Sequence, residues 1–144
     1  MSHDDHYQKL ERMYAGAPCN DYYAPVMRVS KARAEIVIQI QEKFFHSAGA
    51  THGSVYFKAL DDAAFFATNS LVRDALVLTV SFQTYLTRPI SGGEMQAIGS
   101  VVHGSKNLFI AESVLSDSKG REIGRGSGSF VKSKVRLTPE IGYQ

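Results

Sequence analysis

The sequence predicts an α+β fold in which an antiparallel β-sheet wraps around one long buried helix. Residues 53–73 carry apolar side chains at helical spacing around most of the helix circumference, which is typical of a helix buried on all sides. From residue 75 onward, runs rich in Val, Thr and aromatic residues alternate with turn signals, which is typical of successive strands. Because the chain has 144 residues and no linker long enough to divide it, we expect a single domain over residues 1–144.

Shorter elements are expected before the long helix. Residues 4–14 place apolar side chains at helical spacing, so a short N-terminal helix is expected within a leader of residues 1–18. A strand is expected at residues 26–29, and residues 34–41 alternate apolar and polar side chains as a half-buried strand does. Residues 44–51 are expected to form a loop of small residues that leads into the long helix.

Four strands are expected after the helix, arranged as a meander. Asp117 and Gly120 mark a hairpin turn, because both residue types accept the unusual dihedral angles of tight turns. A glycine-rich run at residues 124–129 resembles a nucleotide-binding loop, but no helix follows it. We therefore interpret it as a strand whose backbone another segment approaches closely. The expected strands are residues 75–86, 94–103, 108–116 and 121–132.

The charge of the chain is nearly balanced, since 16 Lys and Arg residues against 14 Asp and Glu residues leave a net charge of +2. The densest basic stretch, residues 132–136, alternates with Ser and Val as a solvated strand end does, so no nucleic-acid partner is expected. No apolar run approaches about 18 residues and the leader is polar, so neither a membrane span nor a signal peptide is expected. Cys19 is the only cysteine, which excludes an intrachain disulfide and fits a reducing cytoplasm.

The five histidines show no spacing typical of a metal site. His3 and His6 lie on the leader, and His103 lies far from the others along the chain. Neither H-x₃-H nor H-E-x-x-H occurs, so we expect no metal and no cofactor.

The long helix carries two adjacent carboxylates, Asp61 and Asp62, within its apolar run. An Asp residue is almost never fully buried without a partner, so one of the two is expected to face a pocket, a subunit interface or a capping partner. Because neighbouring residues on a helix point about 100° apart, only one of them can face a given cleft.

This order of elements, together with several motifs, resembles the hotdog-fold acyl-CoA thioesterases of the PaaI type, the phenylacetic acid degradation and 4-hydroxybenzoyl-CoA thioesterase-like group. The resemblance covers most of the chain. Within it, a His-Gly pair at residues 52 and 53 is followed by an acid, Asp61, nine residues after the histidine. The other matching segments are LERMY at residues 10–14, GATHGS at residues 49–54, TVSFQTYL at residues 79–86, Pro89, Gly93 and DSKG at residues 117–120.

The resemblance implies that the protein hydrolyses an acyl-CoA to a carboxylic acid and coenzyme A, with coenzyme A as part of the substrate. It implies that Asp61 acts as base or nucleophile and that the Gly53 N–H polarises the thioester carbonyl at the positive end of the helix dipole. It leaves Asp62 for an ion pair or a subunit contact. Because Gly53 and Asp61 lie roughly 12 Å apart along one helix, a site shared across a homodimer, or a dimer of such dimers, is expected.

Two histidines and a serine flank the expected site. His46 stands where the resembling enzymes commonly carry an amide. A neutral imidazole can replace that amide as a hydrogen-bond donor, a protonated one can assist the leaving thiolate, and a loop residue that only shapes the entrance is the third interpretation. The resemblance implies that His52 holds the loop and the helix entry together, next to Ser54 on the substrate-binding side.

Further polar residues are expected near the substrate. The resemblance implies a hydroxyl on the strand after the helix, Thr79 or Ser81, that positions the carboxylate or a water, although an ordinary strand threonine explains Thr79 equally well. The pantetheine arm of the substrate is expected along the sheet edge, where a turn can meet the nucleotide phosphates or simply be solvated. The residues of that turn are His103, Ser105 and Lys106.

The acyl group is expected to lie beside the helix near its aromatic residues, which favour a medium-length or aryl group. The alternative function is a non-catalytic acyl-CoA-binding hotdog module, which would bind its ligand without releasing a thiol. A hotdog dehydratase fits less well, because it needs a catalytic histidine and an acid on facing elements. The aromatic residues are Tyr56, Phe57, Phe65 and Phe66.

Overall fold

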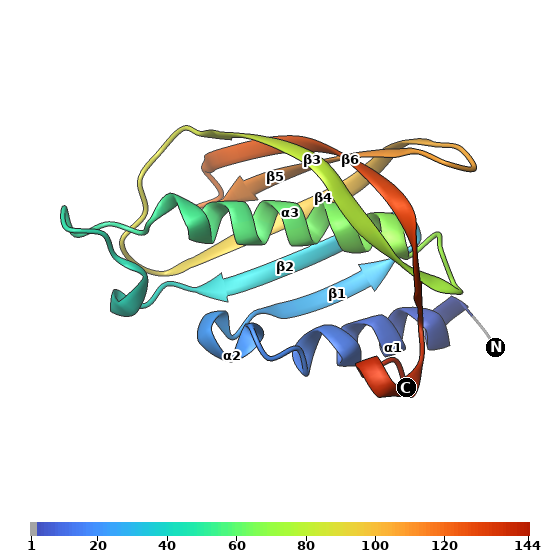
Figure 1. Cartoon of the computed structure of the whole chain (residues 1–144). Coiled ribbons are helices and arrows are strands. Elements are labelled where there is room, and N and C mark those ends of the chain that lie inside the picture. Colours follow the sequence, from blue (N-terminus) through green and yellow to red (C-terminus); the bar gives the residue numbers. More distant parts are fainter. Residues whose placement is uncertain (1–2) are drawn as a thin grey trace.

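A six-stranded antiparallel sheet curves around the long helix α3 in the computed structural model, which describes residues 3–144 (Figure 1). The predicted α+β fold class is confirmed. The helices are α1 (His3–Ala15), α2 (Asn20–Tyr23) and α3 (Gly53–Asn69), with short 3₁₀ turns η1 (Glu42–Phe44) and η2 (Pro139–Ile141). The strands are β1 (Val26–Ser30), β2 (Arg33–Gln39), β3 (Ala75–Leu86), β4 (Glu94–Gly104), β5 (Phe109–Ser116) and β6 (Glu122–Arg136).

The strand order is β1-β2-β4-β5-β6-β3, so the predicted meander of four strands was wrong in one respect. Strands β4, β5 and β6 follow one another, but β3 pairs with β6 at the far edge of the sheet. The segment between β3 and β4 passes the residues that precede α3 and the end of β2 before β4 begins. There the Ile90 carbonyl accepts a hydrogen bond from Thr51 N–H, and the Gly93 carbonyl accepts one from Ile40 N–H, both at 2.9 Å. These anchored contacts place β4 beside β2 rather than beside β3.

Helix α3 lies directly on the sheet because small residues face each other at the contact. A side chain on Gly99 of β4 would place its Cβ 2.2 Å from the Ala63 carbonyl oxygen, so only glycine permits this approach. The Ser113 hydroxyl of β5 donates a hydrogen bond of 2.8 Å to the Leu60 carbonyl. The helix is therefore held to the sheet through its backbone as well as through its buried side chains.

The glycine-rich run in β6 is a strand, as the sequence predicts. A Cβ added at Gly126 or Gly128 would lie 2.4 Å from the ring of Phe82, which sits across these two residues. The interpretation of this run as a backbone that another segment approaches closely is confirmed.

Helix α3 ends at Asn69, four residues before the predicted end at residue 73. The Asn69 amide nitrogen donates to the carbonyls of Val72 and Ala75, and its amide oxygen accepts from Val77 N–H, each at 3.0 Å. These bonds turn the chain into β3. The apolar pattern misled the prediction because Val72 remains buried after the helix has ended.

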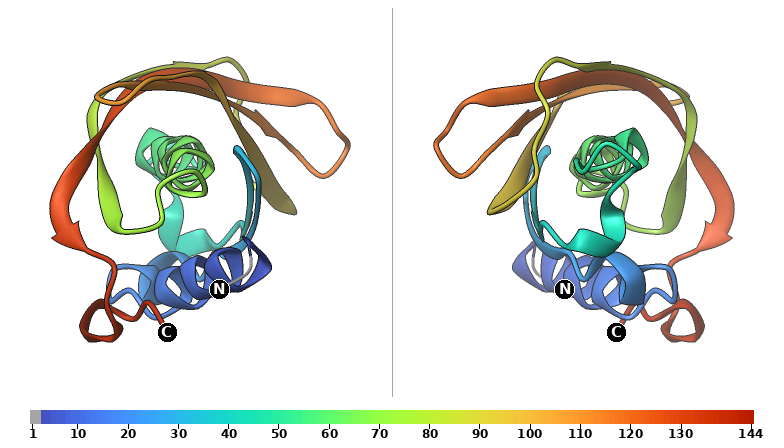
Figure 2. Two further views of the ribbon diagram at one scale, coloured as in Figure 1. Left: turned by 90° about the vertical axis from the view of Figure 1, so that its right-hand side faces the viewer. Right: turned by 90° about the vertical axis from the view of Figure 1, so that its left-hand side faces the viewer.

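The two terminal segments close the side of α3 that the sheet leaves open, as Figure 2 shows along the helix axis. His6 Nε2 donates a hydrogen bond of 3.0 Å to the Asn69 carbonyl, so its Nδ1, 2.7 Å from the Tyr143 hydroxyl, accepts from that hydroxyl when the ring is neutral. Arg12 Nε donates to the Gln144 carbonyl at 2.6 Å. Helix α1 and the segment after β6 are thus joined to each other and to the end of α3.

Candidate active site

The N-terminus of α3 is built by His52 and its neighbours. His52 is the N-cap residue, and its Nδ1 accepts a hydrogen bond of 3.0 Å from Ser54 N–H and lies 2.8 Å from the Ser54 hydroxyl. Gly53 is the first helical residue and is half-buried. The first N–H groups of a helix have no partner within the helix, and they form the positive end of its dipole. His52 and Ser54 therefore hold the N-terminus of α3 in place. The N–H of Gly53, the first residue of the helix, can donate a hydrogen bond to a carbonyl oxygen.

His46 and Gly53 line one hollow of about 300 Å³ at this helix end. The Nδ1 of His46 accepts a hydrogen bond of 3.1 Å from Ala48 N–H, so a neutral ring carries its proton on Nε2 and can donate from there. Thr51 also lines the hollow, and this residue is 4% exposed. Its hydroxyl has no hydrogen-bond partner within residues 3–144, which is uncommon for a buried polar group.

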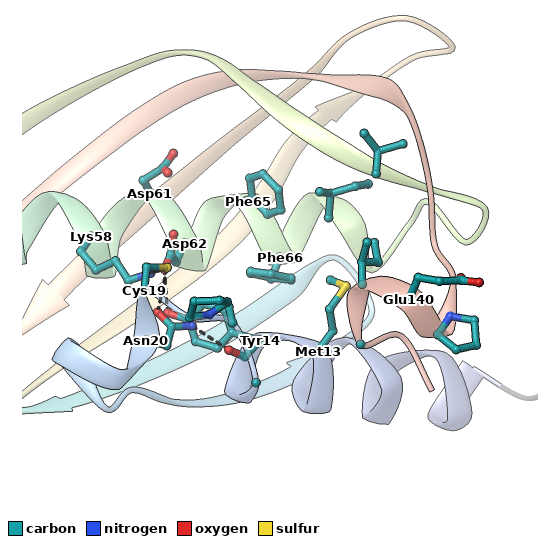
Figure 3. Close-up of a pocket in the computed structure, with 18 residues that line it drawn as sticks. Met13, Tyr14, Cys19, Asn20, Lys58, Asp61, Asp62, Phe65, Phe66 and Glu140 are labelled. Carbon is teal, nitrogen blue, oxygen red and sulfur yellow. Dashed lines mark hydrogen bonds and ion pairs between the residues drawn. The ribbon is translucent and has the colours of Figure 1, made fainter.

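Asp61 lies about two turns further along α3, at the wall of a separate pocket of about 700 Å³ (Figure 3). The Thr79 hydroxyl of β3 donates a hydrogen bond of 2.9 Å to Asp61 Oδ1. Burial raises the pKa of Asp61 to about 6; the Thr79 bond and Lys58 lower it, whereas the neighbouring Asp62 raises it further. The acid is thus held in place and is ionised near neutral pH, with a basicity well above that of an ordinary Asp.

Asp62 points away from Asp61 and toward α1, as Figure 3 shows. Its Oδ2 lies 2.6 Å from Lys58 Nζ and accepts a hydrogen bond of 2.7 Å from the Tyr14 hydroxyl. Burial and the charge of Asp62 raise the pKa of Tyr14. The predicted ion pair of Asp62 is confirmed, and Lys58 compensates its negative charge within the pocket that Asp61 also lines.

The remaining predicted residues lie elsewhere. Ser81 is exposed and lines a third hollow, because a bulge between Thr79 and Ser81 shifts the strand register. In the turn after β4, the Ser105 hydroxyl lies 3.1 Å from the Leu108 carbonyl and 3.2 Å from the Leu108 nitrogen, so it serves to close the turn. The structure therefore joins Thr79 to Asp61 and His46 to Gly53. It brings neither pair together with Ser81, His103, Ser105 or Lys106.

The aromatic residues expected around the acyl group divide between two places. Phe65 and Phe66 line the Asp61 pocket. Tyr56 lines the hollow at Gly53, and its hydroxyl donates to the Arg88 carbonyl at 2.7 Å. Phe57 packs edge-on against Phe82 with ring centroids 5.7 Å apart. Only two of the four aromatic residues expected around the acyl group therefore line the pocket that contains Asp61.

Several residues of these cavities were missed at the sequence level. Met13, Ile141 and Val135 line the Asp61 pocket, although they lie far from Asp61 along the chain. No local pattern connects such distant residues, since only the closure of α1 and the last segment over α3 brings them together. The signal for Thr51 was its place beside His52 in the loop that precedes the helix.

Two kinds of feature are absent from the described part of the chain. Within it, no cluster of three or more His, Cys, Asp or Glu side chains is arranged to hold a metal ion. None of its helices is both long enough and apolar enough to span a membrane.

Comparison with solved structures identifies the fold. The PaaI protein from the phenylacetic acid degradation operon of E. coli superposes with a TM-score of 0.85 at 16% identity, over 94% of this chain and 98% of that one. A thioesterase family protein from Silicibacter pomeroyi gives 0.81 at 22% identity, over 88% and 96%. The TT0310 protein from Thermus thermophilus gives 0.74 at 15% identity, over 81% and 98%. The chain therefore has the hotdog fold.

Comparison of the sequence identifies the family. No protein with a curated description matches the chain. The family model for the thioesterase superfamily matches residues 48–123, a stretch that begins after His46 and includes α3, with Gly53 and Asp61, and strands β3 to β5 with Thr79. Because this match covers just over half of its residues, the chain belongs to the thioesterase superfamily.

Proposed function

We propose that the protein is an acyl-CoA thioesterase, which converts an acyl-CoA and water to a carboxylic acid and coenzyme A. The observation that carries this proposal is Asp61, a carboxylate with its pKa raised to about 6, held by Thr79 at the wall of a large pocket. A general base works best when its pKa lies near the operating pH. Membership of the thioesterase superfamily and the likeness to the PaaI protein support the choice of reaction.

In the proposed mechanism the Asp61 carboxylate either removes a proton from the attacking water or attacks the thioester carbonyl itself. Either route places negative charge on the carbonyl oxygen and then expels the coenzyme A thiolate. The Gly53 N–H would stabilise that oxygen, with the His46 Nε2–H and the Thr51 hydroxyl as further donors in the same hollow. A buried hydroxyl that lacks a partner supports the interpretation of this hollow as a ligand site.

A second copy of the chain would complete the proposed site, because none of residues 3–144 lines both the Gly53 hollow and the Asp61 pocket. Strand β3 is an edge of the sheet, and its side chains Leu78 and Val80 are 48% and 64% exposed. An edge strand with exposed apolar side chains is a template for pairing with another strand. Pairing of two β3 strands would bring the Asp61 side of one protomer toward its partner. A homodimer, or a dimer of such dimers, is therefore proposed.

Three parts of the proposal go beyond the two cavities. The residues of the turn after β4, His103, Ser105 and Lys106, are proposed contacts for the nucleotide phosphates of coenzyme A. A cytoplasmic location is proposed because Cys19 is the only cysteine and is exposed. Coenzyme A enters as part of the substrate, and the mechanism needs no resident cofactor.

The reaction itself is tested by following thiol release from a panel of aliphatic and aryl acyl-CoAs. Turnover that saturates with substrate concentration is expected for at least one class. Saturable binding without thiol release would instead favour the alternative function, a non-catalytic acyl-CoA-binding module. The separation of Gly53 from Asp61 within one chain is the observation that keeps this alternative in view.

Replacing Thr79 should shift the pH dependence of turnover. The Thr79 hydroxyl lowers the pKa of Asp61 by hydrogen bonding to its charged form, so Thr79→Val should raise that pKa above about 6. Because the ionised carboxylate is the active form, the acidic limb of the kcat profile should move to higher pH in this variant. Thr79→Ser keeps the hydroxyl and should keep the wild-type midpoint. An unchanged midpoint in Thr79→Val would mean that this hydroxyl does not tune the acid.

Replacing His46 should separate its three possible roles. If the ring donates a hydrogen bond from Nε2, His46→Gln or His46→Asn should retain most activity, and His46→Ala should fall well below both. We expect this first result, since Nδ1 is already engaged as an acceptor. If the ring protonates the leaving thiolate, all three variants should fail and wild-type kcat should decline as pH rises. Three variants with wild-type activity would make His46 a residue that only shapes the entrance.

A further inference from the structure

We infer that the segment after β6, residues 137–144, forms with α1 the distal wall of the acyl pocket and thereby limits the length of the acyl group. This inference rests on the proposed function, because it takes Asp61 as the position of the thioester. The pocket next to Asp61 holds about 700 Å³, within the range of about 300–1,000 Å³ that small-molecule sites occupy. It therefore has room for much more than the reacting carbonyl.

The pocket changes character along its length. At one end Asp62 is neutralised by Lys58 and the Tyr14 hydroxyl, beside Asp61. Away from these groups the walls are apolar, and Figure 3 shows Phe65, Phe66 and Met13 lying between Asp61 and Glu140. The apolar lining residues are Met13, Phe65, Phe66, Leu76, Val135 and Ile141. A chain whose carbonyl lies at Asp61 would gain most by extending along these residues.

The distal wall belongs to the last segment of the chain. Pro139, Glu140 and Ile141 of η2 all line the pocket, as does Met13 of α1. Gly142 follows with φ = +94°, and a Cβ built there would lie 3.4 Å from the Met13 Cα. The backbone of the last segment thus packs closely against both the Cα and the side chain of Met13 in α1.

Hydrogen bonds hold this wall in place. The Tyr143 hydroxyl lies 2.7 Å from His6 Nδ1, and Arg12 Nε donates to the Gln144 carbonyl at 2.6 Å. Lys9 Nζ lies 5.4 Å from the centre of the Tyr143 ring, a cation–π contact. Because Tyr143 is buried against α1, the segment is anchored next to the residues that line the pocket.

Glu140 narrows the class of acyl group. It lies at the distal end of the pocket, and a hydrogen bond with Thr138 lowers its pKa, so it stays charged at neutral pH. A second carboxylate at the far end of a substrate would meet this like charge. Chains carrying a terminal carboxylate are therefore disfavoured relative to neutral acyl groups, and added salt should weaken this preference because Glu140 is exposed.

The length limit is tested by changing Ile141 and measuring kcat/KM for straight-chain acyl-CoAs from acetyl to palmitoyl. Burying one CH₂ group contributes about 0.8 kcal/mol, a factor of about four, so excluding two of them should cost roughly tenfold or more. Ile141→Trp should reduce kcat/KM by about that factor for the longest accepted chains and leave the short chains nearly unchanged. Ile141→Ala should move the optimum to longer chains.

A matched control is Val114→Trp, because Val114 and Ile141 have similar exposure, 36% and 38%, and Val114 lies on β5 outside the pocket. It should leave the chain-length profile unchanged. Binding of the same acyl-CoA series to an Asp61→Asn protein, measured by calorimetry, provides a readout that does not depend on turnover. The affinity should rise with chain length and level off earlier when Ile141→Trp is added.

Two outcomes would overturn the length limit. One is an Ile141→Trp protein whose profile over chain length matches the wild type, and the other is a uniform loss across all chains with no change in the binding series. In both cases a wild-type protein that releases thiol would leave the proposed function standing. A wild-type protein that binds acyl-CoAs without releasing thiol would reject the proposed function, while the binding series would still decide the role of Ile141.

Discussion

Replacing Asp61 with asparagine should reduce turnover by a factor on the order of 10² or more, as expected when a general base is removed. The amide oxygen can still accept the Thr79 hydrogen bond, so the side chain should stay in place while it loses its basicity. The measurement is kcat with the best acyl-CoA substrate, alongside the oligomeric state of the variant. Loss of activity with unchanged assembly would separate a chemical role from a structural one.

The same substitution should stabilise the folded protein at neutral pH. Since the pKa of Asp61 is raised to about 6, the folded state binds more protons than the unfolded state between roughly pH 4 and pH 6. The free energy of unfolding therefore falls as pH rises through this window, by about 1–3 kcal/mol at full effect. Asparagine removes this penalty, so Asp61→Asn should raise Tm at pH 7.5 and have little effect at pH 4.

The matched control is Asp62→Asn, because Asp62, unlike Asp61, forms an ion pair. Asp62 is paired with Lys58 and Tyr14, so the amide should leave a lysine without its partner and lower the stability slightly. Its effect on kcat should be much smaller than that of Asp61→Asn. A reversal of the two activity effects would show that Asp62, and not Asp61, carries the chemistry.

Replacing Gly53 with proline should also cost a factor of about 10²–10³ in kcat, the usual effect of losing one oxyanion donor. Proline is well tolerated at the first helical position, and the preceding His52 already has the extended backbone that proline requires, with ψ = 146°. The substitution therefore deletes one N–H while leaving the helix. Gly53→Ala is the control, because it adds a Cβ that meets only the Leu86 side chain, at 2.9 Å, and keeps the N–H.

Mixing the two inactive proteins should restore activity if the site is shared. A dimer of one Asp61→Asn subunit and one Gly53→Pro subunit would contain one site with both defects and one site with neither. Thiol release should therefore reappear on subunit exchange, which native mass spectrometry can follow in parallel. Mixed dimers with no more activity than their parents would place Gly53 and Asp61 in separate sites. A fully active monomer would contradict the shared site as well.

Local patterns were sufficient to predict most of the fold. The alternation of Ile36, Ile38 and Ile40 and the apolar circumference of residues 53–73 report burial directly, so β2 and α3 were expected close to where they form. The end of α3 was wrong because it is set by side-chain bonds of Asn69 and not by hydrophobicity. The place of β3 beside β6 was missed because strand order depends on contacts between distant segments.

Some residues of the candidate site were predicted from local sequence patterns, and others were not. Gly53 and Asp61 were selected by the resemblance to a family in which an acid follows a His-Gly pair at this spacing, a local pattern. The same resemblance offered Thr79 or Ser81 as the hydroxyl near the acid, and it is Thr79 that bonds to Asp61. The walls built by Met13 and residues 137–144 had no local signature, since they depend on how the two ends of the chain meet over α3. The exposed position of Ser81 was also hidden, because a single-residue bulge reverses the facing of a strand.

The contact between Gly99 and the Ala63 carbonyl has a consequence for how this protein tolerates change. Asp61 lies two residues before Ala63 on α3, and the Thr79 hydroxyl of β3 bonds to its carboxylate. The distance of this carboxylate from the sheet therefore depends on one backbone contact and one hydroxyl group. Neither support depends on the size of the surrounding core side chains. Any side chain at residue 99 would therefore push α3, and Asp61 with it, away from the sheet.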